Sequence, residues 1–198
     1  MELTVKEVQA WLDKFTEKIE ANKAYLSDLD TPIGDGDHGN NMGRGVAAYQ
    51  ESLAKQKPTT IPDTFKAMTM AMISKVGGAS GPLYGSAFMG MTKAAQGMDA
   101  ITSQAELQTI IAAGLDGIKQ RGKAEVDDKT MVDVWEAIVG LIEAGDFTVE
   151  AVETAKNNTK DMLAKKGRAS YLGERSIGHI DPGAASSALL FESLIEVL

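Results

Sequence analysis

The stretch TVKEVQAWLDKFTEKI, residues Thr4–Ile19, has the spacing of an amphipathic α-helix. Its opening residues match a capping box, in which Thr4 and Glu7 would satisfy free backbone N–H groups at a helix start. Its apolar residues recur every three or four positions and therefore share one face. We expect this helix to end near Tyr25. The residues of the apolar face are Val5, Val8, Trp11, Leu12, Phe15 and Ile19.

The same spacing continues through the rest of the chain and predicts seven more helices. Short links separate them, such as residues 57–60 and 97–102. Alternating apolar and polar residues, which would indicate strands, are absent. Eight amphipathic helices with short links predict an all-α fold, an antiparallel bundle or barrel. The expected helices after the first are 41–55, 62–73, 82–91, 107–118, 135–142, 149–163 and 182–195.

Composition limits the classes of protein to consider. A chain of 198 residues with 43% hydrophobic content can form one substantial core, so we expect a single domain over residues 1–198. The net charge of −8 disfavours nucleic acid and anionic membrane surfaces as partners. The chain has no cysteine, which excludes disulfides and thiolate sites. It also lacks a leader-like segment and an apolar run of membrane-spanning length, so we expect a cytoplasmic protein.

Three aspartates lie close together in the glycine-rich stretch LDTPIGDGDHGNNM, residues 29–42: Asp30, Asp35 and Asp37. Carboxylates this close repel one another unless a cation lies between them, and oxygen ligands suit Mg²⁺ or Ca²⁺. A Gly-x-Gly-x-x-Gly match in the same stretch resembles the dinucleotide fingerprint, but that motif needs a preceding strand and a helix is expected there. A solvated turn that caps the next helix would use one acid and leave two unexplained. The stretch therefore predicts a metal site.

Two other stretches have features of an anion site. Gly77–Gly85 is a glycine-rich turn that runs into a helix, where free N–H groups and the helix dipole favour phosphate. A tight turn between packed helices explains the same residues equally well. Lys166–Arg175 is basic, and Arg168 could meet phosphate, although a basic helix C-terminus is the alternative. Asp181 followed by Pro182 is expected to cap and open the last helix.

Taken in order, these stretches resemble the L subunit family of dihydroxyacetone kinases. The resemblance covers nearly the whole chain and implies a barrel of eight antiparallel helices, with a nucleotide held by the loops at one end. This agrees with the number of helices that the spacing predicts. The segments that carry it are Ile33–Gly39, Gly77–Gly85, Asp128–Met131, Gly167–Arg175 and Gly178–Ala184.

The resemblance also implies roles for individual residues. Asp30, Asp35 and Asp37 would hold Mg²⁺, expected as a pair of ions that bridge the nucleotide phosphates. His38 and Arg168 are candidate contacts to the transition state, and no catalytic residue is assigned beyond them. The residues expected to contact the nucleotide are His38, Gly39, Asn40, Asn41, Ala79, Ser80, Gly122, Met131, Arg168, Asp181, Pro182 and Gly183.

Within that set, the adenine and ribose are expected beside Gly122, Met131 and the Asp181 segment. The chain departs from the family pattern at two places. Ala79 stands where some members have Ser or Thr, and Val126-Asp127 replaces a common Pro-Gly, which could reshape the loop over the base. Neither departure removes a metal ligand.

The expected function is a phosphoryl relay in a multisubunit dihydroxyacetone kinase of glycerol metabolism. ADP would be a bound cofactor: the M subunit of the phosphotransferase system would phosphorylate it from a phosphohistidine. The ATP formed would then phosphorylate dihydroxyacetone on the K subunit. The resemblance thus implies a phosphoenolpyruvate-glycerone phosphotransferase that is active only with partner subunits. Two alternatives are an L subunit that exchanges free ATP and a nucleotide-sensing coregulator of a transcription factor.

Overall fold

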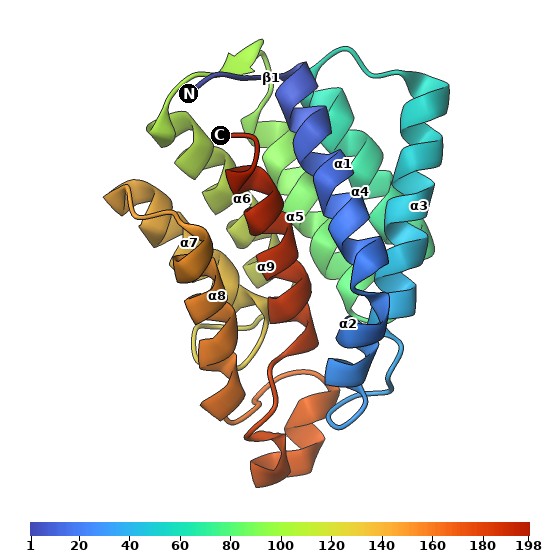
Figure 1. Ribbon diagram of the computed structural model, residues 1–198, viewed down its shortest axis with the longest axis vertical. Helices are drawn as coiled ribbons and strands as arrows, with labels where there is room; N and C mark the ends of the chain where they lie inside the picture. Colours follow the sequence, from blue (N-terminus) through green and yellow to red (C-terminus); the bar gives the residue numbers. More distant parts are fainter.

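The computed structural model, which describes residues 1–198, has nine α-helices, and eight of them alternate in direction around a closed barrel (Figure 1). None of them is both long enough and apolar enough to cross a membrane. The helices are α1 Val5–Ala21, α2 Lys23–Asp30, α3 His38–Gln56, α4 Ile61–Lys75, α5 Ser80–Ala94, α6 Gln104–Gly122, α7 Met131–Ala144, α8 Val149–Asn158 and α9 Pro182–Ile195.

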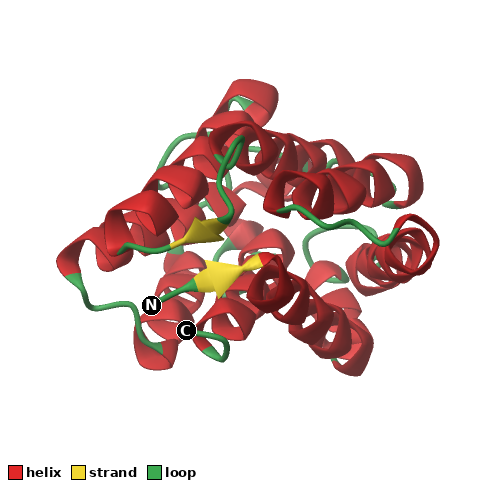
Figure 2. Ribbon diagram, turned by 90° about the horizontal axis from the view of Figure 1, so that it is seen from above, coloured by secondary structure: helices red, strands yellow, loops and turns green.

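All the helices except α2 are neighbours around the ring. Each packs on the next in the order α1, α3, α4, α5, α6, α7, α8 and α9, and α9 packs back on α1. The view from above shows helices on all sides of the two short strands (Figure 2). The short strands β1 Leu3–Thr4 and β2 Ala100–Ile101 pair antiparallel at the end where both termini lie. Two 3₁₀ segments, η1 Thr159–Asp161 and η2 Arg168–Ser176, lie at the opposite end. The predicted all-α barrel is therefore confirmed.

The predicted helix starts form through side-chain caps. Thr4 and Glu7 make both bonds of the capping box of α1. Asp181 caps α9, because its carboxylate accepts a hydrogen bond of 2.8 Å from the N–H of Ala184. Each such cap contributes about 1 kcal/mol by satisfying an N–H group that has no partner within the helix.

Two predicted boundaries are wrong. The first helix does not continue to Tyr25, because Asn22 leaves the helical conformation at φ −113° and ψ 14°. The Asn22 side chain donates a hydrogen bond of 2.8 Å to the carbonyl of Lys18, and α2 then begins afresh. The seventh predicted helix stops at Asn158 instead of residue 163, where the chain tightens into η1. The break after α1 turns the chain toward the aspartate-rich loop.

One cluster of 43 buried hydrophobic residues fills the barrel. Trp11 on α1 lies in it and donates a hydrogen bond of 2.8 Å from its indole to the carbonyl of Leu190 on α9. Trp135 on α7 packs edge-on against Phe191 with ring centroids 4.8 Å apart. These two indoles hold α9 between α1 and α7, and so they close the ring.

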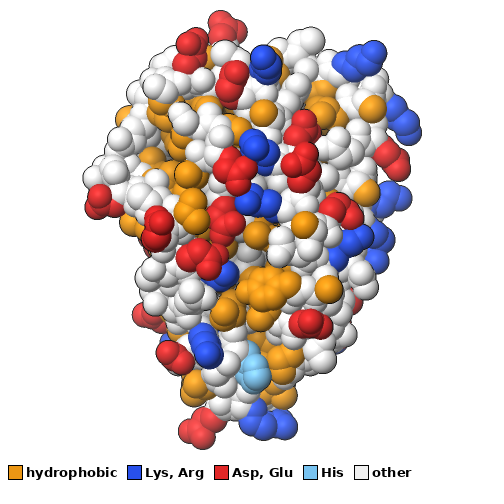
Figure 3. Space-filling view, viewed as in Figure 1, with side chains coloured by type: hydrophobic (Ala, Val, Ile, Leu, Met, Phe, Trp, Pro, Cys, Tyr) orange, Lys and Arg blue, Asp and Glu red, His pale blue; other side chains and the backbone are white.

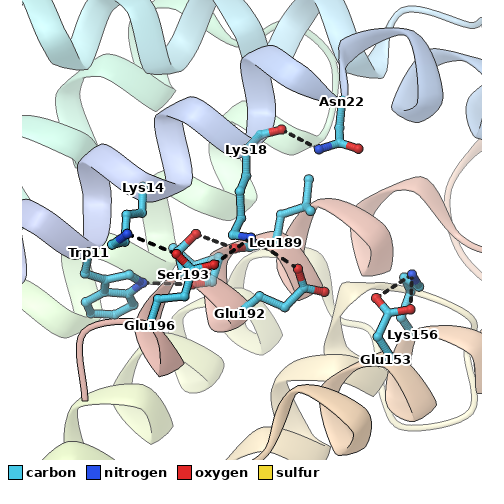
Figure 4. A network of polar contacts seen from close by, with 11 residues as sticks. Trp11, Lys14, Lys18, Asn22, Glu153, Lys156, Leu189, Glu192, Ser193 and Glu196 are labelled. Atoms are coloured by element: carbon cyan, nitrogen blue, oxygen red, sulfur yellow. Dashed lines mark hydrogen bonds and ion pairs between the residues drawn. The ribbon is translucent and has the colours of Figure 1, made fainter.

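Charged side chains cover the seam where α1, α9 and α8 meet. On this face basic and acidic groups alternate around apolar side chains (Figure 3). Lys18 on α1 lies 3.8 Å from Glu192 on α9 and 2.8 Å from Glu196, the residue that directly follows α9 (Figure 4). Glu153 on α8 pairs with Lys156 at 2.6 Å and lies beside Glu192. Burial raises the pKa of Glu192 to about 7, and the neighbouring Glu153 adds to the rise.

This raised pKa makes stability depend on pH. An acid that binds its proton more tightly in the folded protein contributes stability fully below its unfolded pKa of about 4.5, and that contribution is lost as pH rises towards 7. Glu192→Gln should therefore melt a few degrees above the wild type at pH 8 and lose this advantage as the pH falls to 5. Thermal melts followed by circular dichroism at both pH values measure the difference. Glu150→Gln, at an exposed position of α8, serves as the control and should give the same shift at both; an equal shift for Glu192→Gln would contradict the prediction.

Candidate functional site

The loop between α2 and α3 is built around the carboxylate of Asp30. One of its oxygens accepts hydrogen bonds from the backbone N–H groups of Asp37 at 3.0 Å and His38 at 3.2 Å. A Cβ on Gly34 would lie 2.0 Å from the other oxygen, and Gly36 turns the chain at φ +75°. The three predicted metal ligands are brought together, since Asp30, Asp35 and Asp37 offer oxygens that all lie within 4.8 Å of one another.

The environments of the three carboxyls differ. Burial raises the pKa of Asp30 and of Asp37 above the usual range. The pKa of Asp35 is lowered, first by a hydrogen bond with Asp37 and further by the charge of Arg168. Holding these acidic groups close together therefore costs the folded chain free energy, and a cation between them would reduce that cost. A donor set of carboxylate oxygens alone fits a hard divalent ion such as Mg²⁺.

These carboxylates open onto a cavity of about 550 Å³ at the end of the barrel opposite the termini. Four alternate helices, α3, α5, α7 and α9, begin at its wall. Helix N-termini carry partial positive charge, so their convergence favours an anionic ligand in a protein whose net charge is −8.

The predicted anion turn forms one side of this cavity. Gly78 has φ +66°, and a Cβ on Gly81 would lie 2.2 Å from the carbonyl of Val76, so the turn requires both glycines. Ala79 and Ser80 line the cavity at the start of α5, where no side chain caps the helix. The first N–H groups of α5 are therefore free to bind an anion, whereas a side-chain cap occupies the starts of α7 and α9.

His38 lines the cavity floor and is 5% exposed. Its Nδ1 lies 3.2 Å from the hydroxyl of Ser80 and its Nε2 lies 2.9 Å from that of Ser186. The hydroxyl of Tyr84 contacts Ser186 at 2.7 Å and Ser187 at 3.0 Å, which extends the network into the core. Burial lowers the pKa of His38 to about 4, so the ring is neutral at physiological pH.

Arg168 reaches the metal-ligand cluster from the other side of the mouth. Its guanidinium lies 2.9 Å from the carboxylate of Asp35, and its side chain is 70% exposed. Gly167 precedes it at φ +68°. The interpretation of this basic stretch as a helix C-terminus is wrong, because Arg168 begins η2. Its position brings a largely exposed positive charge to the entrance of the cavity.

The inner end of the cavity is formed where α6 ends and where α7 and α9 begin. Gly122 and Met131 line it together with the residues at the start of α9. A Cβ on Gly183 would lie 3.5 Å from the Cβ of Met131, so these two walls almost touch. Asp181 completes this end, and burial raises the pKa of its carboxyl to about 7. The residues predicted for the adenine and ribose are thus brought together.

Two predicted contact residues do not line the cavity. Gly39 is buried against α2, where a Cβ would lie 1.8 Å from the carbonyl of Lys23, and its N–H donates to the hydroxyl of Ser27 at 3.1 Å. Asn40 is exposed on the outer side of α3. Asn41, in contrast, is buried at the cavity wall. Consecutive side chains of an α-helix point about 100° apart around the helix axis, so residues that are neighbours in sequence cannot all face one ligand.

Several residues that line the cavity have no individual role in the sequence analysis, although some lie in the stretches quoted there. Those with charged side chains lie near the end of α6, directly before the start of α7 and in the segment before η2. The apolar ones come from several elements, and periodicity gave no signal for them because they follow the same pattern as core residues. These lining residues are Ile33, Leu83, Ile118, Arg121, Ala124, Lys129, Thr130, Val132, Lys166 and Ala169.

The chain is similar to subunits of known dihydroxyacetone kinases. It is 54% identical over 187 residues to the "PEP-dependent dihydroxyacetone kinase 1, ADP-binding subunit DhaL" of Listeria innocua, a match that covers 94% of this chain and 93% of that protein. It is 50% identical over 196 residues to the "PTS-dependent dihydroxyacetone kinase, ADP-binding subunit DhaL" of Lactococcus lactis, covering 99% of both.

The barrel also matches a solved structure. The crystal structure of the dihydroxyacetone kinase from C. freundii in complex with AMP-PNP and Mg²⁺ superposes with a TM-score of 0.74 at 23% identity, covering 99% of this chain and 34% of that one. This likeness shows the fold. The model of the DAK2 domain matches residues 32–196. The chain therefore belongs to the DAK2 domain family of dihydroxyacetone kinases.

Proposed function

We propose that this chain is the ADP-binding subunit of a multisubunit dihydroxyacetone kinase, with one nucleotide-binding domain over residues 1–198. Relatives of nearly the same length that carry this name support the proposal. The observation that carries it is the meeting, at one cavity, of three carboxylates within 4.8 Å and the uncapped start of α5. A diphosphate with a divalent ion needs both features.

Each group of residues at the mouth of the cavity would have a different role in phosphoryl transfer. Asp30, Asp35 and Asp37 would hold Mg²⁺, which when bound neutralises charge on the transferred phosphoryl group. The backbone N–H groups at the start of α5 would bind phosphate oxygens. His38 contributes hydrogen bonding without charge, because burial lowers its pKa to about 4. Arg168 would exchange Asp35 for phosphate oxygens and supply positive charge in the transition state.

The inner end would hold the nucleoside. Gly122 and Met131 would face the base, and the segment Asp181–Gly183 would face the ribose. Asn41 would bind at the phosphate end, where its side chain lies beside Asp37 and the glycine turn at Gly77. Gly39 and Asn40 are not included among these contacts, because neither lines the cavity.

The nucleotide would serve as a carrier within the complex. In this proposal it receives a phosphoryl group from the phosphohistidine of a phosphotransferase-system protein, the M subunit. It then passes the group to dihydroxyacetone on the K subunit, in the cytoplasm. The names of the relatives, which include dependence on phosphoenolpyruvate or the phosphotransferase system, support this direction of transfer. They give no support to a transcriptional coregulator.

Native mass spectrometry of the purified protein, with no nucleotide added, tests the proposal. We expect a mass higher than that of the chain by ADP and Mg²⁺, and loss of this adduct after exhaustive dialysis against EDTA. An empty chain that binds ATP reversibly would instead support the L subunit that exchanges free ATP. A chain that binds neither nucleotide in the presence of Mg²⁺ would refute the assignment.

A further inference from the structure

Lys129 is a buried lysine with no carboxylate partner. It is 1% exposed, directly before the N-cap of α7, with a backbone φ of +61° that only a minority of residues adopt. Its ammonium donates to the backbone carbonyls of Thr159 and His179 and, at 3.3 Å, to that of Lys160. Among the ion pairs within 4.0 Å, none includes Lys129.

Burial of an ammonium among neutral groups is costly, so this arrangement needs a physical reason. The carbonyls of Thr159 and Lys160 belong to η1, directly after the C-terminus of α8, where helix carbonyls lack partners and the dipole is negative. Lys129 therefore acts as a cationic cap on α8 that is delivered from another part of the chain. Burial lowers the pKa of Lys129, and the charge of Asp181 opposes that fall most strongly among its neighbours.

The same point joins three segments that are far apart in sequence. The N–H of Gly178 donates to the carbonyl of Lys160 at 2.7 Å. The N–H of Asp181 donates to the hydroxyl of Thr159 at 3.0 Å. With the bonds from Lys129, these contacts fix the residues before α7, the end of α8 and the residues before α9 in one frame. This frame borders the inner end of the cavity, because Lys129 and Asp181 are among its lining residues.

We propose that Lys129 is a positioning residue for the nucleoside part of the nucleotide. It fixes the start of α7, which carries Met131, relative to the start of α9, which carries Asp181–Gly183. These two walls lie close together, because a Cβ added to Gly183 would lie 3.5 Å from the Cβ of Met131. Asp30 ends α2, and Asp35 and Asp37 lie in the loop that follows; their hydrogen bonds and ion pair involve Asp37, His38 and Arg168, and none joins them to this frame. The inference rests on the proposed function, because it assumes that the cavity holds a nucleotide.

The phosphate end and the nucleoside end of the cavity are formed by different segments. A ligand that occupies both ends can therefore be compared with one that occupies only the phosphate end, and a general loss of stability would weaken the binding of both. Both proteins would first be freed of bound nucleotide by exhaustive dialysis against EDTA. Calorimetry would then compare Lys129→Met with the wild type for binding of ADP and of inorganic pyrophosphate, each with Mg²⁺, at a temperature where both proteins are folded. We expect ADP to bind about tenfold or more weakly to the variant, because charged hydrogen bonds that shape the nucleoside wall are lost. Pyrophosphate should bind equally to both.

Lys156→Met is the matched control. Lys156 is also a largely buried lysine, at 12% exposure of its side chain, but it pairs with Glu153 on the outer surface of α8. Its loss should leave both affinities unchanged. Thr159→Val provides a second, milder variant of the frame, since it removes the hydroxyl that accepts from Asp181 and keeps the volume of the side chain. It should weaken the binding of ADP and leave the binding of pyrophosphate unchanged. If Lys129→Met does not fold, this variant tests the positioning role of the frame.

The outcomes are distinct. Unchanged ADP affinity in the folded frame variants would overturn the positioning role of Lys129. Equal weakening of ADP and pyrophosphate would also overturn it, because the effect would then reach the whole cavity. If the wild type itself binds no ADP, the proposed function fails, and this is seen before any variant is compared.

Discussion

Asp35→Ala is expected to abolish phosphoryl transfer and leave the fold intact. Asp35 is exposed and its ion-pair partner is Arg168, on the surface, so its removal should cost little stability. The metal site, in contrast, loses one of three carboxylates and should lose several kcal/mol of transition-state stabilisation. We therefore expect transfer to fall by about a thousandfold or more. The measurement is formation of dihydroxyacetone phosphate with the partner subunits, alongside the far-ultraviolet circular dichroism of the variant.

Asp28→Ala is the matched control for this experiment. Asp28 lies exposed on α2, near the same loop, and its removal changes the net charge equally without touching the cluster. It should retain transfer. Normal transfer by Asp35→Ala would overturn the assignment of the metal ligands. Equal loss in both variants would indicate that charge near the mouth matters, and not coordination.

Gly39→Ala is expected to lower the free energy of unfolding by about 3 kcal/mol or more. The added Cβ would lie 1.8 Å from the backbone carbonyl of Lys23, and backbone atoms cannot yield as a flexible side chain can. Relief of the clash requires α3 to move away from α2. This movement would also separate Asp30 from the backbone N–H groups whose hydrogen bonds it accepts. Urea denaturation measures the loss. Weaker ADP binding by the folded variant should accompany it.

Gly140→Ala is the control at a glycine with free space. Gly140 lies inside α7, and nothing lies within 4 Å of the position of an added Cβ. Alanine is favoured over glycine in a helix by about 0.8–1 kcal/mol, so this variant should be slightly more stable than the wild type. If Gly39→Ala were as stable as Gly140→Ala, the close packing of α2 on α3 would not be a requirement of the fold.

The periodicity of apolar residues was sufficient to predict the barrel, because every helix in the ring buries one continuous face. It could not predict the break at Asn22, since the same spacing continues on both sides of it. Only the φ and ψ angles of that residue and its side-chain bond to Lys18 end the helix. The caps at Thr4 and Asp181 were predictable, because each depends on residues three positions apart.

The candidate site was predictable in part. The aspartates are close in sequence, and the short loop makes them close in space. The nucleoside end was expected only from the resemblance, because Gly122, Met131 and Asp181 lie on three different helices or their starts. Lys129 gave no interpretable signal in the sequence. Its significance depends on three carbonyls contributed by two segments, about thirty and about fifty residues away, which no local pattern reveals.

Both ends of the chain lie at the end of the barrel opposite the cavity. A domain or tag attached to either terminus therefore starts at a distance from the mouth and leaves it open to solvent. To bring such an attachment to the mouth, a linker must run back along the barrel. The 14 residues of α9 alone span about 21 Å, which corresponds to at least about six or seven extended residues. Shorter linkers would tether this domain without reaching its cavity, a rule that fusion proteins and surface immobilisation can use directly.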